Sequence, residues 1–279
     1  MIEITWQYDP DAPARRAEPA TAEEAFFSLQ RGNRAFADLG RDGGHGRYVI
    51  PVAAEELGFG QVPGIAPLQT PSAALLGCAD ARVPLELVFS QSANDVFAVR
   101  VAGNVLDGAS VGSIDFAVTN LPTLRAIAVV GHTGCGAARA AMDTYLDPAS
   151  YVGLSANLPL RGIVDAVTPA VRAADMALRA HYGASVVDRP GFSDALLDAS
   201  VVLNTAIAGD AVRRIFADHL HEGLGVAFGV YDLASRLVGL PNQHDEWRPG
   251  LSSPPGPDET AGFLEQVVTS VYIRRLLEI

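Results

Sequence analysis

Short apolar runs alternate along the chain with longer stretches whose apolar residues recur at helical spacing. The apolar runs predict buried strands at 73–77, 95–101, 126–130 and 226–231, with 237–240 as a hairpin-like partner of the last. The helical spacing predicts helices over 22–39, 84–89, 110–120, 136–146, 161–182 and 193–219, the last interrupted at Gly209. Strands that alternate with helices are typical of an α/β fold with a mostly parallel central sheet flanked by helices.

The two ends of the chain depart from this alternation. Residues 1–20 are acidic and Pro-rich, so we expect an N-terminal arm before a single α/β domain over 21–249. Thr21 and Glu24 have the spacing of a capping box at the start of the first helix. Residues 250–279 are expected to form a linker and a docked C-terminal segment, a helix or a strand. Irregular segments are expected at 41–46, 50–71, 147–159 and 187–191.

Composition narrows the classes of function. The formal net charge of -12 argues against a nucleic-acid partner, because phosphates would be repelled. No apolar run reaches the ~18 residues that cross a bilayer. The N-terminus lacks the apolar core of a secretory signal, so we expect a cytoplasmic protein. The chain has 2 cysteines, which excludes a disulfide scaffold and leaves either small buried residues or thiols available to a metal.

Metal-capable residues follow two of the predicted strands. Cys78 comes directly after one, and His132 and Cys135 lie in the turn after another. The carboxyl ends of parallel strands share one edge of a sheet, so these residues can converge. Zinc favours thiolate and imidazole ligands, and a catalytic zinc has three protein ligands and one open position. Cys78, His132 and Cys135 are therefore predicted to hold one Zn²⁺.

Asp80 and Arg82 come directly after Cys78. Their spacing of two places them on the same side of an extended segment, where Arg82 can hold Asp80 ionised in a bidentate pair. An ordinary ion pair at the end of a strand is the simpler interpretation, and the neighbouring cysteine favours a role in catalysis.

These residues carry a family resemblance. Cys78-Ala-Asp80-Ala-Arg82 followed by His132-Thr-Gly-Cys135 resembles the signature of the β-class carbonic anhydrases, Cys-x-Asp-x-Arg and then His-x-x-Cys. The resemblance covers roughly 22–240 and extends to Arg31-Gly-Asn33-Arg34, Gln69-Thr-Pro71, the strand Asp95 to Asn104, and Val230 to Leu233.

The resemblance implies an activity and a role for each residue. It implies that a zinc-bound hydroxide on Cys78, His132 and Cys135 hydrates carbon dioxide reversibly to bicarbonate and a proton. Asp80 would accept a hydrogen bond from the hydroxide, with Arg82 holding Asp80. Substrate would be bound by Gln69, Phe97 and the backbone N–H of Gly136. In some members of the family the counterpart of Asp80 ligates zinc in a closed state. A homodimer or a dimer of dimers is implied, with the pocket at the subunit interface.

One departure from the family keeps other functions open. The family usually has Ser on both sides of Asp80, and this chain has Ala79 and Ala81. One alternative is a related zinc hydrolase acting on carbonyl sulfide or carbon disulfide, and another is a non-catalytic homologue that binds zinc or bicarbonate. A dinucleotide-binding domain is disfavoured, because Gly131, Gly134 and Gly136 lack the Gly-x-Gly-x-x-Gly spacing.

The two predicted thiolate ligands give an expected pH dependence. Because they neutralise Zn²⁺, a bound water should be less acidic than in a three-histidine site. We expect kcat/KM for CO2 hydration to rise with pH through a pKa above ~7. Stopped-flow rates measure this, and a flat or falling profile between neutral and alkaline pH counts against a hydroxide nucleophile.

Overall fold

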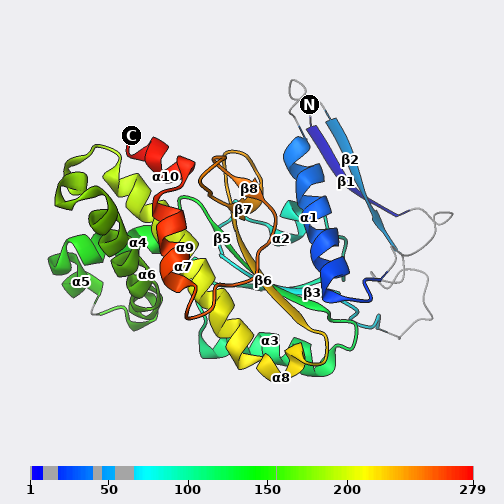
Figure 1. Cartoon of the computed structure of the whole chain (residues 1–279). Helices are drawn as coiled ribbons and strands as arrows, with labels where there is room; N and C mark the ends of the chain where they lie inside the picture. The colour runs from blue at the N-terminus through cyan, green and yellow to red at the C-terminus, as the bar shows by residue number, and fades with distance from the viewer. Residues whose placement is uncertain (1, 9–17, 40–45, 54–65, 155, 279) are drawn as a thin grey trace.

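A six-stranded sheet with helices on both faces forms the centre of the structure, a computed structural model that describes residues 2–8, 18–39, 46–53, 66–154 and 156–278 (Figure 1). Its strand order is β4-β3-β5-β6-β7-β8. The first four in this order are parallel, and they are β4 (Val96–Arg100), β3 (Ala73–Gly77), β5 (Ala126–His132) and β6 (Gly225–Tyr231). β7 (Val238–Leu240) and β8 (Arg248–Pro249) are antiparallel additions. The predicted α/β fold with a mostly parallel sheet is confirmed.

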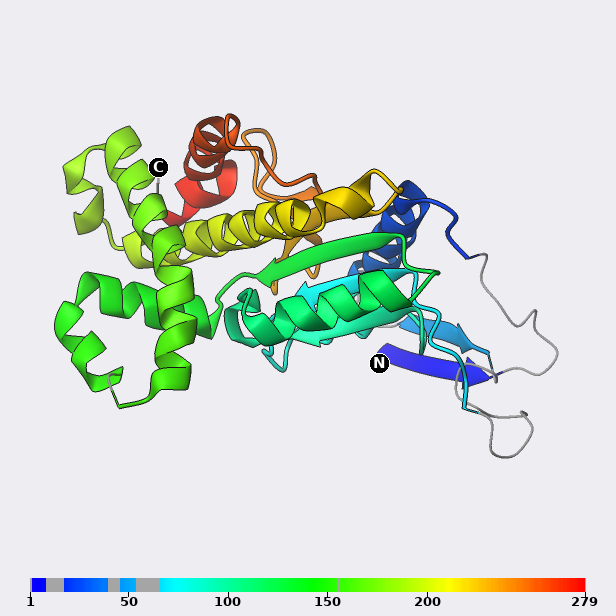
Figure 2. The same cartoon turned by 90° about the horizontal axis from the view of Figure 1, so that it is seen from below.

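Helices connect these strands and cover both faces of the sheet (Figure 2). The helices up to β5 are α1 (Ala22–Asp38), α2 (Leu85–Val88), η2 (Ala102–Asn104) and α3 (Gly108–Asn120). Those between β5 and β6 are α4 (Gly136–Leu146), α5 (Pro148–Leu154), α6 (Leu158–Tyr182), η3 (Ala184–Asp188), α7 (Phe192–Ile215) and α8 (Ala217–Leu220). The chain ends with α9 (Thr260–Val268) and α10 (Val271–Leu276).

The apolar runs form strands because both faces of the sheet are covered. Every residue of β3 and β5 is buried, so these strands need apolar side chains at odd and even positions alike. Leu75 belongs to the core beneath α1 and α2, whereas Leu76 belongs to the larger core beneath α4, α6 and α7. The two cores are separated only by the sheet, and its central strands supply side chains to both.

Strand register brings the predicted ligands to one edge. Gly77 pairs with Val130 on one side and with Arg100 on the other, so Cys78 leaves β3 at the level where β5 approaches His132. β5 continues through His132, which pairs with Tyr231 of β6. The carboxyl ends of three neighbouring parallel strands therefore meet where the sequence predicts the metal site.

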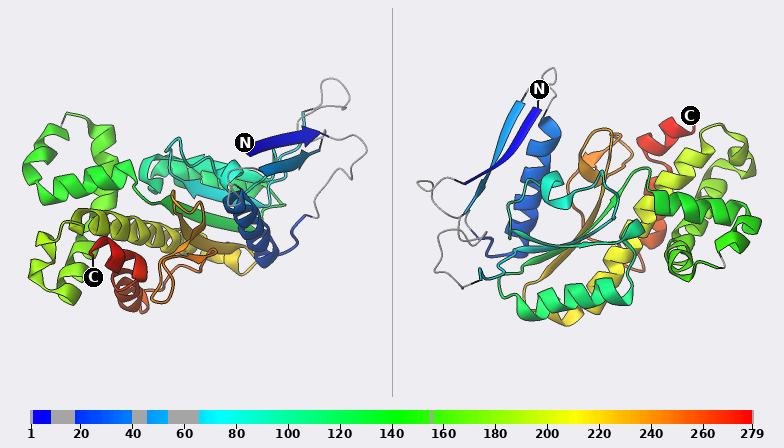
Figure 3. Two further views of the ribbon diagram at one scale, coloured as in Figure 1. Left: turned by 90° about the horizontal axis from the view of Figure 1, so that it is seen from above. Right: turned by 180° about the vertical axis from the view of Figure 1, so that it is seen from behind.

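The expected N-terminal arm contains a strand. Ile2–Tyr8 forms β1, which pairs in parallel with β2 (Gly46–Val52) in a separate two-stranded sheet, here called the N-terminal ribbon. Figure 3 shows this ribbon beside α1, apart from the central sheet. The indole N–H of Trp6 donates to the carbonyl of Gln91 at 3.3 Å and links the ribbon to the rest of the protein. The irregular segment expected at 50–71 is wrong at its start, because residues 50–52 belong to β2. The rest of the arm over 9–17, residues 41–45 of the expected break and residues 54–65 lie outside the described residues.

Three other predictions about elements are corrected. Residues Pro148–Leu154 of the expected loop form helix α5. Helix α7 is continuous through Gly209, where a break was expected. A side chain at this position would press on Phe228 and Pro254, so the glycine allows close packing. The expected linker pairs with the sheet, since Ser252 and Phe228 exchange backbone hydrogen bonds of 2.8 and 2.9 Å.

Among the described residues, helix α7 is long and apolar enough to cross a membrane by length and composition alone, although polar residues interrupt its sequence. Its mean hydropathy reaches 1.4 over an 18-residue window, and 78% of that window is buried inside the structure. The helix packs against β5 and β6 on one side and α6 on the other, so its apolar surface is used by the core.

The contact between α1 and the end of α2 gives a stability prediction. Gly32 of α1 lies against the backbone carbonyl of Phe89, where an added Cβ would overlap the oxygen. We expect Gly32→Ala to lower the free energy of unfolding by about 1–3 kcal/mol in urea denaturation. Gly112→Ala in α3 is the matched control, because nothing lies within 4 Å of its added Cβ, and it should be neutral or stabilising by up to ~1 kcal/mol. Equal losses in both variants would contradict the packing argument.

Candidate metal centre

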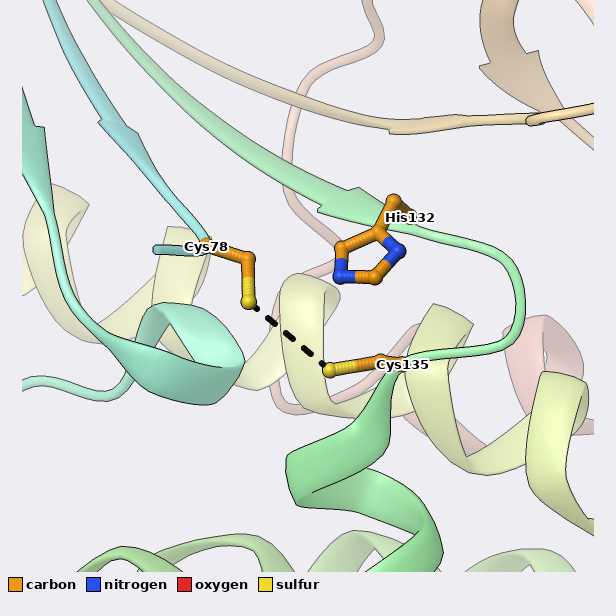
Figure 4. Close-up of side chains that lie close together, drawn as sticks. All are labelled: Cys78, His132 and Cys135. Carbon is orange, nitrogen blue, oxygen red and sulfur yellow. Dashed lines mark hydrogen bonds between the residues drawn. The ribbon is translucent and has the colours of Figure 1, made fainter. Parts of the chain in front are cut away.

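Three side chains from separate segments converge at the edge of the sheet (Figure 4). Cys78 follows β3, His132 is the last residue of β5, and Cys135 is the N-cap of α4. Their Sγ and ring nitrogen atoms all lie within 4.8 Å of one another, and the two sulfurs are 3.9 Å apart. All three residues are buried. The predicted convergence of these three residues is confirmed.

His132 is held in an orientation that suits metal binding. Its Nδ1 lies 3.0 Å from the carbonyl oxygen of Thr133, so Nδ1 carries the proton and Nε2 keeps a free lone pair. Nε2 is fully buried and has no hydrogen-bond partner among the described residues. An unpaired buried nitrogen is costly, and a metal ion would satisfy it.

Backbone N–H groups surround both sulfurs. The N–H of Gly103 donates to the Cys78 sulfur at 3.3 Å, and the first N–H groups of α4 face the Cys135 sulfur. The hydrogen bond from the Cys135 thiol is the main cause of a lowered pKa at Cys78, and the same contact raises the pKa of Cys135. Negative charge is thus favoured on the Cys78 sulfur, whereas the Cys135 thiol beside it donates to that sulfur and stays protonated.

Asp80 and Arg82 form the predicted pair beside these ligands. Arg82 donates from Nε to Oδ1 at 3.0 Å, from Nη2 to Oδ2 at 2.7 Å, and from its backbone N–H to Oδ1 at 2.9 Å. The Arg82 side chain therefore holds the pKa of Asp80 well below its usual range. Oδ2 lies 3.7 Å from Nε2 of His132, so the carboxylate faces the metal ligands. The pair forms although Ala79 and Ala81 offer no hydroxyl group.

Arg100 supports the same turn, and its role was missed in the sequence. From β4 it donates to the carbonyl of Cys78 at 3.0 Å and to the carbonyl of Asp80 at 2.6 Å. Its guanidinium thereby fixes the backbone between ligand and carboxylate. The signal in the sequence was weak, because a charged residue at the end of a strand is usually solvated.

The predicted substrate-binding residues lie at different distances from the metal ligands. Gly136 is the first residue of α4, directly after Cys135, so its N–H belongs to the helix terminus at the site. Gln69 is exposed and precedes β3, whereas Cys78 follows that strand, which puts roughly 17 Å of strand between them. Phe97 pairs with Ala74 near the start of β3 and contacts Phe116 at a ring distance of 6.4 Å. Within one chain, Gln69 and Phe97 are not brought to the ligands.

The donor set fits zinc. Two thiols and one imidazole supply three ligands of the type that zinc prefers, and the described residues bring no fourth His or Cys into the cluster. Three ligands leave one position for water or substrate, with the Asp80 carboxylate beside it. The arrangement suits activation of a water molecule next to a fixed hydrogen-bond acceptor.

Comparison with known proteins agrees with this chemistry. A family model described as "Carbonic anhydrase" matches residues 73–234, more than half of the chain. Carbonic anhydrase 2 of Mycobacterium tuberculosis is 43% identical over 111 residues, which are 39% of this chain and 49% of that protein. The chain thus spans about half the length of the curated relatives it matches.

The chain also matches solved structures of β-carbonic anhydrases. The β-carbonic anhydrase CafA of Aspergillus fumigatus is 23% identical, with a TM-score of 0.47 over 70% of this chain and 82% of that chain. Two tetrameric β-carbonic anhydrases of Sordaria macrospora have been solved, and the matching chain is 18% identical, with a TM-score of 0.39 over 61% of this chain and 80% of that chain.

The geometry predicts one zinc ion per chain. We expect purified protein to hold close to one equivalent of zinc by atomic emission, and His132→Gln or Cys78→Ser to lose most of it, because two ligands rarely retain zinc. His221→Gln, at an exposed histidine, is the matched control and should keep its zinc. Retention of full zinc by His132→Gln would argue against the site.

Proposed function

The chain belongs to the β-class carbonic anhydrase family, and from this premise we propose that it catalyses the reversible hydration of carbon dioxide to bicarbonate and a proton. The observation that carries the proposal is the convergence of Cys78, His132 and Cys135, the Cys-His-Cys set typical of zinc in this family. A zinc ion held by these residues would supply positive charge that acidifies a water molecule and makes it a nucleophile near neutral pH.

Asp80 acts in this proposal as a hydrogen-bond acceptor that orients the attacking water. Arg82 keeps the carboxylate ionised, and its side chain donates one hydrogen bond to each carboxylate oxygen. Oδ2 lies 3.7 Å from Nε2 of His132, and its remaining lone pair can accept the proton of a water bound beside that nitrogen. An acceptor that is already fixed saves the entropy of orienting the nucleophile toward carbon dioxide.

Substrate binding in this proposal requires a second copy of the chain. The N–H of Gly136 would bind a substrate oxygen in the same chain, whereas Gln69 and Phe97 lie too far from their own metal ligands and would serve the partner's site. β4 is an edge strand, and the exposed Phe116 lies beside Phe97, so apolar surface is available there. Homologues in the family include tetramers, and we propose a homodimer or a dimer of dimers here.

We also propose a cytoplasmic location. A reducing compartment keeps Cys78 and Cys135 as thiols, and these two sulfurs must stay reduced to hold a metal.

Asp80 provides the test of the mechanism. We expect Asp80→Asn to lower kcat/KM for CO2 hydration by about a hundredfold, because an amide cannot supply the same acceptor charge. Its zinc content should stay unchanged, since zinc binding uses the other three residues. Asp165→Asn is the matched control, because it also removes an Arg-paired carboxylate, 3.3 Å from Arg161, and should leave the rate unchanged.

Stopped-flow CO2 hydration by the zinc-loaded protein decides between the candidate functions. Absence of hydration in a protein that holds zinc would overturn the proposal and favour a non-catalytic homologue. Release of sulfide from carbonyl sulfide or carbon disulfide at a higher kcat/KM would instead assign the related hydrolase activity.

A further inference from the structure

Asp198 is a buried carboxylate on α7 that the proposed reaction does not use. One of its oxygens accepts a hydrogen bond from the backbone N–H of Gly134 at 2.9 Å. The other accepts from the hydroxyl of Tyr272 at 2.7 Å. The residue is 8% exposed, so these two donors replace most of the water that an aspartate would otherwise bind.

Gly134 lies inside the turn that carries two of the metal ligands, between His132 and Cys135. Its φ of 65° is left-handed, so the course of the turn depends on this residue. The preceding residue is held from β6, because the N–H of Thr133 donates to the carbonyl of Tyr231 at 3.0 Å. Asp198 holds the other half of the turn from α7. The direction in which Cys135 leaves the turn is therefore fixed from two elements.

Tyr272 is itself held firmly in α10. Its ring packs against Trp247 at 5.5 Å, edge to face, and Arg275 lies over it at 5.3 Å. The N–H of Val271 donates to the carbonyl of Asn242 at 2.9 Å and fixes the start of the helix. Burial raises the pKa of Tyr272, so the hydroxyl stays protonated and serves as a donor. Tyr272 lies beyond residue 234, the end of the region that matches the family model.

We propose that Asp198 and Tyr272 are positioning residues for the metal centre, through which the C-terminal helix α10 holds the turn between His132 and Cys135 in its metal-binding shape. The inference rests on the proposed zinc site and adds to it a dependence on residues that lie outside the matched region. Among the described residues neither Asp198 nor Tyr272 forms a hydrogen bond with a ligand side chain, so their effect passes through the backbone of Gly134.

Removing one link should weaken zinc binding without abolishing it. Tyr272→Phe leaves one Asp198 oxygen without its donor, and we expect the dissociation constant for zinc to rise about twofold to tenfold. Asp198→Ala removes both links, and we expect a rise of about tenfold to a hundredfold. Asp198→Asn keeps an oxygen for the N–H of Gly134 and should bind zinc within about threefold of the wild type.

Tyr145→Phe is the matched control. Its hydroxyl donates to the buried carboxylate of Asp175 at 2.9 Å, the same kind of bond as that between Tyr272 and Asp198. Tyr145 lies near the far end of α4, about 15 Å along the helix from Cys135. Its loss should lower the melting temperature much as the loss of the Tyr272 hydroxyl does, with no change in zinc affinity.

The experiment measures zinc affinity of the full chain by competition with a chromophoric chelator, beside the thiolate–metal absorption of the cobalt-substituted protein. The expected result is weaker zinc binding and an altered cobalt spectrum in Tyr272→Phe and Asp198→Ala. Tyr145→Phe should match the wild type in both measurements, and Asp198→Asn should have a zinc affinity close to that of the wild type. If Asp198→Ala does not fold, the comparison of Tyr272→Phe with Tyr145→Phe decides alone.

The possible failures are distinguishable. Wild-type protein that binds no zinc overturns the proposed function and this inference with it. Wild-type protein that binds zinc, with Tyr272→Phe and Asp198→Ala binding it equally well, overturns the inference and leaves the proposed function intact. Equal weakening in Tyr145→Phe also overturns the inference, because the effect would then be general destabilisation.

Discussion

The parallel pairing of β3 with β5 is the contact on which the site depends. Their register sets Gly77 opposite Val130, so Cys78 and His132 follow within two residues of this pair, and Cys135 comes three residues after His132. A slip of one residue would turn each side chain to the other face and separate the sulfur of Cys78 from the ring of His132. Both strands are buried on both faces, so the two cores beneath α1 and α7 hold the register from either side. The relative positions of the metal ligands thus depend on the packing of the two cores.

The sequence was informative where short-range rules decide the structure. Continuous apolar runs predicted β3 and β5, because a strand buried on both faces needs no polar positions. The short spacings within Cys78 to Arg82 and within His132 to Cys135 predicted the metal ligands and the ion pair between Asp80 and Arg82. Both segments begin at the carboxyl ends of neighbouring parallel strands, so topology alone was enough to bring them together.

The sequence was less informative where contacts join distant segments or where polar residues carry a hidden role. β1 was missed although Ile2, Ile4 and Trp6 alternate with polar residues, because the acidic and Pro-rich residues that follow suggested an arm. Asp198 stands alone in an apolar part of α7, which is a signal, but its partners lie 64 and 74 positions away along the chain. Only the tertiary structure reveals such a link.

The N-terminal ribbon is expected to unfold locally, before the central sheet does. Two strands paired only with each other are of marginal stability in water, and the register joins residue 2 to residue 46, so closing the ribbon costs the entropy of a long loop. The indole N–H of Trp6 links it to the carbonyl of Gln91 at 3.3 Å, and Ile50 and Val52 of β2 are buried. We therefore expect the amide hydrogens of β1 and β2 to exchange with solvent through a local opening that leaves the central sheet intact, and those of β5 to exchange only on global unfolding.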